Sequence, residues 1–259
     1  MSAIKIKIDD RVATLILNRP QVRNAFDKDM IDELTRAFGD LSLNPDLRVL
    51  VLEGEGESFC AGADLNWMRS MAKFNRVENI EDSEKLYDMF KALADMPCPV
   101  LSVVQGHVMG GALGLVAASD ICLAQEKTQF CFSEVRLGIA PAVISSFVAA
   151  KVSVADLYRY FLTAEVFGPK EARRMGLVQD FAGAKEIKEI KNRIVKKFLQ
   201  NGPLAVRASK ALLKQIPKME NPRKTTTELI ASLRVSPEGQ EGLTAFLEKR
   251  KPHWLESQS

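Results

Sequence analysis

Short apolar runs alternate with longer amphipathic segments along the first half of the chain. Residues 12–17, 49–52 and 100–104 are rich in β-branched and other apolar side chains, which is typical of buried strands. The segment between the first two runs, 27–43, carries apolar residues at helical spacing: Met30, Ile31, Leu34, Phe38 and Leu41. This alternation of strand and helix predicts an α/β fold.

The alternation continues to about Ala140. We predict a helix over 83–96, another that opens at Gly110, and strands over 120–124 and 128–132. Beyond Ala140 the strand pattern stops and helical segments follow, several of them beginning at proline. The chain is therefore expected to combine an α/β core with a helical C-terminal third.

The N-terminal segment, residues 1–12, alternates polar and apolar residues as a half-buried strand does. It lacks the apolar stretch and small-residue cleavage site of a signal peptide. No run in the chain reaches the ~18 apolar residues of a membrane span. These features predict a cytoplasmic protein that does not bind a membrane.

The composition is that of an ordinary globular protein. Hydrophobic residues make up 46% and charged residues 27%, which excludes disordered and fibrous classes. The net charge of +3 is too small to indicate nucleic acid as a partner. The lysine- and arginine-rich segments 185–197 and 207–224 are interpreted as solvated helix faces, with RNA binding as the weaker alternative.

Cysteine and histidine positions do not indicate a metal site. Four cysteines lie in apolar runs without a CxxC pair, and we interpret them as reduced core residues: Cys60, Cys98, Cys122 and Cys131. The two histidines, His107 and His253, have no second ligand at metal-binding spacing. We expect no metal and no cofactor.

Two segments rich in small residues, 58–65 and 105–114, lie where a strand gives way to the next element. Small residues let the backbone approach a ligand closely. If the amides of Ala63 and Gly111 converge, they form a donor pair for a carbonyl oxygen, and the helix that opens at Gly110 adds its positive end. Either segment alone is more typical of a tight turn, but the pair predicts an oxyanion hole.

The chain resembles the crotonase (enoyl-CoA hydratase/isomerase) superfamily in five blocks that follow the family's order: 18–26, 59–65, 106–118, 130–138 and 245–250. The resemblance covers nearly the whole length. It implies a crotonase-type spiral of ββα units over residues 1–195, which holds the active site. It also implies that residues 196–259 form a helical trimerisation region, in a homotrimer or in a hexamer built as a dimer of trimers.

The resemblance places the oxyanion-hole amides at Ala63 and Gly111, as the small-residue segments do, and the main acid/base at Glu134. Apolar neighbours of Glu134 in the sequence, such as Phe132 and Val135, are expected to raise the pKa of its carboxyl towards neutrality. A raised pKa suits proton delivery to the α-carbon of a thioester. The alternative is a solvated loop glutamate.

One family feature is missing. Hydratases with two catalytic glutamates carry the first in the helix after the glycine pair, and the matching residue here is Gly114. Hydration must handle a proton on water and another on the α-carbon, whereas moving a double bond needs one base. Gly114 therefore favours a Δ3-Δ2-enoyl-CoA isomerase. The segments 111–115 and 130–145, however, resemble the methylglutaconyl-CoA hydratase branch, whose bacterial members can share this glycine, so enoyl-CoA hydratase stays the first hypothesis.

The substrate implied by the resemblance is an acyl-CoA. Asp64 is interpreted as the N-cap of a short helix starting at Leu65, because a carboxylate aimed at an enolate would repel it. Arg136 is expected either to pair with a distal substrate carboxylate or to form a surface ion pair. The complete set of expected substrate-binding residues, in which the last two would come from a neighbouring subunit, is Arg23, Ala61, Asp64, Leu65, Met68, Gly110, Arg136, Phe246 and Lys249.

Overall fold

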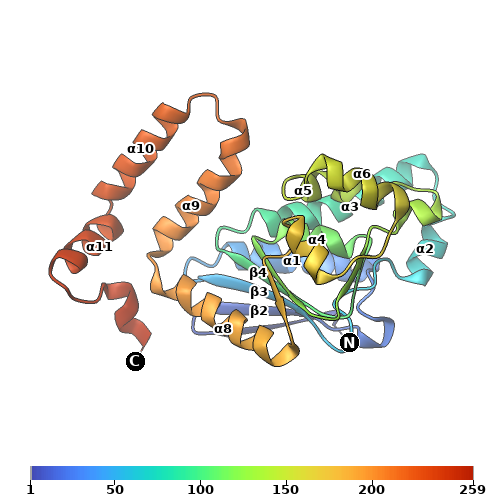
Figure 1. Cartoon of the computed structure of the whole chain (residues 1–259), viewed down its shortest axis with the longest axis horizontal. Helices are drawn as coiled ribbons and strands as arrows, with labels where there is room; N and C mark the ends of the chain where they lie inside the picture. Colours follow the sequence, from blue (N-terminus) through green and yellow to red (C-terminus); the bar gives the residue numbers. More distant parts are fainter. Residues whose placement is uncertain (1, 259) are drawn as a thin grey trace.

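The computed structural model describes residues 2–258 and has a six-stranded sheet at the centre of its body (Figure 1). The strand order is β1-β2-β3-β4-β6-β8, and only β1 and β2 pair antiparallel. A second sheet consists of the parallel pair β5 and β7. The strands are β1 (Ile4–Asp9), β2 (Val12–Leu17), β3 (Val49–Gly54), β4 (Val100–Val104), β5 (His107–Met109), β6 (Ile121–Gln125), β7 (Gln129–Cys131) and β8 (Asp180–Ala182).

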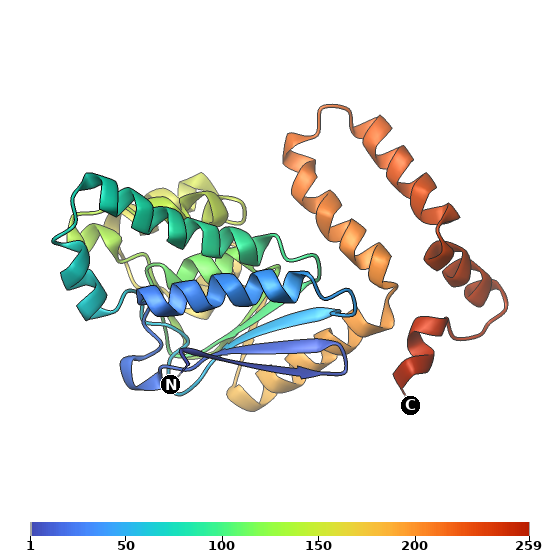
Figure 2. The ribbon, with the colours of Figure 1, turned by 180° about the vertical axis from the view of Figure 1, so that it is seen from behind.

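Helices cover both faces of the large sheet, so its central strands β3 and β4 are mainly buried and apolar (Figure 2). On one face lie α1 (Lys28–Ser42), α3 (Arg76–Ala94) and α4 (Ala112–Ala118). On the other, α8 (Ala184–Gln200) packs its buried isoleucines against β4 and β6. The body also contains η1 (Pro20–Val22), α2 (Leu65–Met71), η2 (Glu134–Leu137), α5 (Ala142–Ala149), α6 (Val154–Thr163) and α7 (Pro169–Arg174).

The C-terminal helices form an arm, defined here as residues 203–258, that projects from the body (Figures 1 and 2). It consists of α9 (Pro203–Gln215), η3 (Ile216–Lys218), α10 (Pro222–Val235), α11 (Pro237–Leu247) and η4 (His253–Gln258). Large apolar side chains on the arm remain exposed, including Leu213, Val235, Phe246 and Leu247. Within one chain, the arm therefore leaves its apolar surface uncovered.

Polar contacts tie α9 to the body, and η4 adds a hydrogen bond from Trp254 Nε1 to the Gln200 carbonyl of α8 at 3.2 Å. The Lys210 ammonium is almost completely buried, pairs with Asp120 at 2.6 Å and donates to the Cys98 carbonyl at 2.9 Å. One turn earlier, Arg207 donates to the carbonyls of Pro45 and Leu47 at 2.7 and 3.0 Å. These cations satisfy carbonyl groups that the ends of the body elements leave without partners.

The predicted α/β order and the buried, unpaired state of the four cysteines are confirmed. Three details were wrong. The first strand is not half-buried: β1 is an edge strand in which only Ile4 is buried. The helix predicted over 83–96 begins earlier, because Asn75 and Glu78 form a capping box. A strand does follow Ala140, since the three residues of β8 complete the sheet.

The predicted division after residue 195 falls inside α8, which continues to Gln200. The arm leaves the body beyond that residue, so a boundary there fits the structure better. Among residues 2–258, no helix is both long enough and apolar enough to cross a membrane.

Candidate active site

The backbone of Ala63 is left free by the way its segment pairs with Phe26. The Phe26 N–H donates to the Gly62 carbonyl and the Asp64 N–H donates to the Phe26 carbonyl, both at 2.7 Å. A parallel bridge of this kind uses the residues on either side of Ala63, so the polar groups of Ala63 itself point away from Phe26. Within residues 2–258, the Ala63 N–H has no hydrogen-bond acceptor.

The segment that contains Gly111 runs beside this one in parallel. Cys60 forms a parallel bridge with Val108, so the two segments lie side by side just before Ala63 and Gly111. The two segments also approach each other closely at Gly62, because a Cβ on this residue would lie 3.0 Å from the Met109 carbonyl oxygen. Gly111 is the N-cap of α4, and its N–H also lacks an acceptor in the described chain. The two amides predicted to form an oxyanion hole thus lie on adjoining segments, and neither N–H is used by a described residue.

Glu134 is the first residue of η2 and lies next to Gly110, the residue before Gly111. A Cβ on Gly110 would be 3.5 Å from Glu134 Oε1, and Gly110 has a φ of +51°, so this position favours glycine in both space and conformation. Burial raises the pKa of the Glu134 carboxyl above its ordinary value of 4.5. The predicted direction of that shift is confirmed.

The second oxygen of the carboxyl, Oε2 of Glu134, is fully buried. Across the described residues it is the one buried side-chain nitrogen or oxygen that has no hydrogen-bond partner. Leaving such a group unpaired costs about 1–3 kcal/mol, so it is uncommon outside functional sites. Glu134 therefore combines burial, a raised pKa and an unused acceptor next to two free amides.

The position that matches the missing glutamate is closed by hydrocarbon. A Cβ on Gly114 would lie 2.5 Å from Phe90 Cζ and 2.7 Å from Ile144 Cγ2. Both neighbours are buried, and the Phe90 ring packs edge-on against Phe26 and Phe147. No side chain can leave α4 at this point without displacing Phe90 or Ile144.

Asp64 is the N-cap of α2, as predicted, and accepts from the Asn66 N–H at 2.8 Å. The next residue, Leu65, is 69% exposed, while Met68 is half-buried one turn later. The Ala61 N–H donates to the Arg23 carbonyl at 3.0 Å, which places the exposed Arg23 next to the segment that contains Ala63. Ala61, Asp64 and Leu65 thus belong to the same stretch of chain as Ala63, and Arg23 is hydrogen-bonded to it.

Three predicted substrate-binding residues either bind another part of the chain or lie far from Glu134. Arg136 is exposed and donates to the Ala164 carbonyl at 2.5 Å, at the end of α6, and makes no ion pair with a described residue. Phe246 and Lys249 belong to the arm, and α11 lies on the opposite side of the molecule from α2 (Figures 1 and 2). One chain does not bring these two residues to Glu134.

Two residues of the site were not singled out from the sequence. The ring of Phe26 lies 3.5 Å from the position of a Cβ on Gly111, so this residue contacts both amide segments. Arg19 forms ion pairs with Asp27 and Asp64. Both residues fall in the first of the five sequence blocks, 18–26, and membership of this block was the sequence feature that could have identified them.

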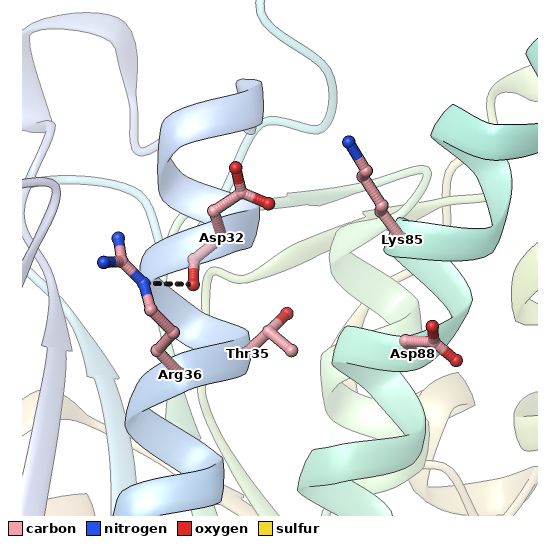
Figure 3. A pocket seen from close by; sticks show the side chains of 5 residues that line it. All are labelled: Asp32, Thr35, Arg36, Lys85 and Asp88. Carbon is pink, nitrogen blue, oxygen red and sulfur yellow. Dashed lines mark hydrogen bonds between the residues drawn. The ribbon is translucent and has the colours of Figure 1, made fainter. Parts of the chain in front are cut away.

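A polar hollow of about 460 Å³ lies between α1 and α3, away from this site (Figure 3). Its lining mixes acidic and basic side chains: Asp32, Thr35, Arg36, Lys85 and Asp88. Neither Glu134 nor the two free amides line it. We therefore do not assign it to the chemistry at Glu134.

Comparison with known proteins gives a consistent result. Residues 7–257 match the family model described as enoyl-CoA hydratase/isomerase. A crotonyl-CoA hydratase of Syntrophomonas wolfei is 31% identical over 97% of both chains. A trans-2-decenoyl-[acyl-carrier-protein] isomerase of Streptococcus mutans is 26% identical over 96% of both. The crystal structure of an enoyl-CoA hydratase from Shewanella pealeana superposes with a TM-score of 0.93 at 38% identity, covering 97% of this chain and 96% of that one.

Proposed function

Because the chain belongs to the enoyl-CoA hydratase/isomerase family, we propose that it adds water across the double bond of a 2-enoyl-CoA thioester. Membership confirms the predicted superfamily and the crotonase-type fold. The observation that carries the proposal is the buried, unpartnered Oε2 of Glu134, whose carboxyl lies next to Gly110, while the N–H groups of Ala63 and Gly111 have no acceptor among the described residues.

Hydration can proceed with one carboxylate. The thioester oxygen accepts from the N–H groups of Ala63 and Gly111. Ionised Glu134 takes a proton from water as the water oxygen bonds to the β-carbon, and the π electrons move onto the thioester oxygen to give an enolate. Protonated Glu134 then delivers that proton to the α-carbon, the thioester carbonyl re-forms, and Glu134 returns to its ionised state.

The raised pKa of Glu134 suits both steps. A carboxylate with an ordinary pKa would be a weak base towards water, whereas a raised pKa makes the carboxylate more basic, and its protonated form is still acidic enough to protonate the much more basic α-carbon of the enolate. The two amides contribute most when negative charge develops on the oxygen. In other enzymes, removal of one such donor costs about 3 kcal/mol in the transition state.

The test is Glu134→Gln, which keeps the shape of the side chain and removes its base. We expect turnover of crotonyl-CoA, followed by loss of its conjugated thioester absorbance, to be abolished while acyl-CoA still binds. Glu126→Gln is the matched control, because Glu126 is exposed in the turn after β6 and should leave the rate unchanged. Near-normal turnover by Glu134→Gln would refute the proposal.

The apolar side chains of Phe90 and Ile144, here called the hydrocarbon wall at Gly114, favour a second candidate, a Δ3-Δ2-enoyl-CoA isomerase. In that reaction Glu134 would remove a proton from C2 of a 3-enoyl-CoA and return it at C4, so a second carboxylate is not needed. Formation of conjugated absorbance from a 3-enoyl-CoA measures this activity. If it exceeds hydration of the corresponding 2-enoyl-CoA by a large factor, isomerisation is the main activity.

A branched or carboxylated acyl group, such as methylglutaconyl, remains part of the proposal. Arg136 is the candidate partner of its distal carboxylate, although one of its nitrogens already donates to Ala164. Arg136→Met should lower the preference for methylglutaconyl-CoA over crotonyl-CoA. An unchanged preference would remove Arg136 from the substrate site.

A further inference from the structure

Arg19 lies behind the Ala63 amide and joins the two segments that hold it. Its Nη1 donates to the Ala25 carbonyl at 2.5 Å. Its Nη2 contacts Asp27 Oδ2 at 2.8 Å and Asp64 Oδ2 at 3.1 Å. Ala25 and Asp27 flank Phe26, and Asp64 follows Ala63, so one guanidinium spans both sides of the bridge that leaves the Ala63 N–H free.

Both aspartates are already used by a helix. Asp27 Oδ1 accepts from the Met30 N–H at 2.9 Å and caps α1. Asp64 Oδ1 accepts from the Asn66 N–H at 2.8 Å and caps α2. Each carboxylate thus caps a helix with one oxygen and binds Arg19 with the other. The planar, multi-donor guanidinium can hold all of these acceptors at once, whereas an ammonium binds as a point charge.

The charge of Asp64 matters because of its place. This carboxylate is only 7% exposed and directly follows Ala63, where a thioester oxygen would become negative in the proposed reaction. An uncompensated buried carboxylate there would oppose that charge, since screening by water is weak in the interior. The Arg19 side chain, 18% exposed, supplies the compensating cation.

From this geometry we propose that Arg19 is a positioning residue for the reaction: it fixes the Ala63 amide and neutralises Asp64 behind the oxyanion hole. The inference rests on the proposed function. It concerns a residue that acts through Ala63 and Asp64 and does not itself touch the substrate.

The first test is a double-mutant cycle of Arg19→Met and Asp64→Asn. Arg19→Met should lower kcat about tenfold to a hundredfold, with a smaller change in KM, because misplaced or opposed oxyanion donors affect mainly the transition state. Asparagine keeps the capping oxygen of Asp64 and removes its charge. The double variant should therefore recover part of the lost rate. If the double variant is as slow as Arg19→Met or slower, Arg19 does not act by neutralising Asp64.

The second test measures how strongly the two amides polarise a bound thioester carbonyl. A 4-dimethylaminocinnamoyl-CoA bound to the protein should absorb at longer wavelength as the two amides polarise its thioester carbonyl. At saturating ligand, Arg19→Met should show a smaller shift. Arg159→Met is the matched control, because Arg159 also makes a two-point ion pair, with Glu165, on the exposed surface of α6. A full shift and a normal kcat in folded Arg19→Met would overturn the inference.

If Arg19→Met does not fold, Arg19→Lys takes its place in both measurements. It retains the charge but loses the planar fork, so we expect an intermediate shift and rate. An unaltered shift in this variant would contradict the positioning role. Failure of the proposed function shows differently: Glu134→Gln would keep its turnover, or the wild-type chain would leave the absorbance of the bound probe unshifted.

Discussion

The substitution Gly114→Ala tests how firmly the hydrocarbon wall closes the position of the missing glutamate. The added Cβ would lie 2.5 and 2.7 Å from two carbons of the Phe90 ring and 2.7 Å from Ile144 Cγ2. Carbon atoms in good contact lie about 3.5–4.0 Å apart, so both neighbours must move by about 1 Å. Phe90 is not exposed, and it packs against Phe26 and Phe147 at ring-centroid distances of 6.5 and 5.8 Å.

Two opposing effects set the magnitude. Overpacking a well-packed core costs about 1–3 kcal/mol. Alanine is favoured over glycine in a helix interior by about 1 kcal/mol, which offsets part of that cost. We therefore expect Gly114→Ala to lower the free energy of unfolding by up to about 2 kcal/mol. Movement of Phe90 should also reach Phe26, whose ring contacts Gly111, so kcat should fall as well.

Equilibrium unfolding in urea, followed by the midpoint and slope, measures the stability effect. Gly39→Ala is the matched control: Gly39 is exposed in α1 and a Cβ there meets nothing within 4 Å. It should raise the stability by up to about 1 kcal/mol. If Gly114→Ala were as stable as Gly39→Ala, Phe90 and Ile144 would be able to move aside at little cost. The argument that α4 cannot carry a second carboxylate would then fail.

Three further predictions concern charge and assembly. Burial raises the pKa of Glu134, so ionisation of this carboxyl opposes folding near pH 7. Glu134→Gln should therefore raise the free energy of unfolding at pH 7. Urea titrations should show this gain in stability disappear as the pH falls below 4.5, the ordinary pKa of a glutamate. Lys210→Met should cost about 2–4 kcal/mol because it removes the cation of the partly buried Asp120 and the donor to the Cys98 carbonyl, and limited proteolysis should show faster cleavage of the arm. Val235→Asp, on the exposed surface of α10, should shift the predicted trimer or hexamer to smaller species in sedimentation, whereas Leu43→Asp, equally exposed on the body, should not.

Local pattern was sufficient for most of the fold. Strands β2, β3 and β4 are mainly apolar because helices cover both faces of the sheet, and α1 buries one face of a clear helical repeat. What failed depended on context. The isoleucines of β1 alternate as if half-buried, but no element covers their face at the edge of the sheet, and the three residues of β8 are too few to form a pattern.

The site was predictable as far as it depends on backbone chemistry. Small residues indicated where Ala63 and Gly111 expose their amides, and apolar neighbours indicated the raised pKa of Glu134. The residues that shape the site from a distance were not predictable. Phe90 reaches Gly114 from α3, and Arg19 reaches Asp64 from the loop after β2, so each contact exists only once the helices and strands have packed.

The wall at Gly114 bears on which reaction a single carboxylate can perform. A buried water typically makes about three hydrogen bonds, and Phe90 and Ile144 offer it none on the side where a second glutamate would stand. Isomerisation needs no water, so the wall leaves that activity untouched. For hydration, Glu134 alone can act as the base, and a distal carboxylate on the acyl group would give the water a second acceptor. We therefore expect kcat/KM for hydration to be higher with methylglutaconyl-CoA than with crotonyl-CoA. Equal values for the two thioesters would mean that the water is held in some other way.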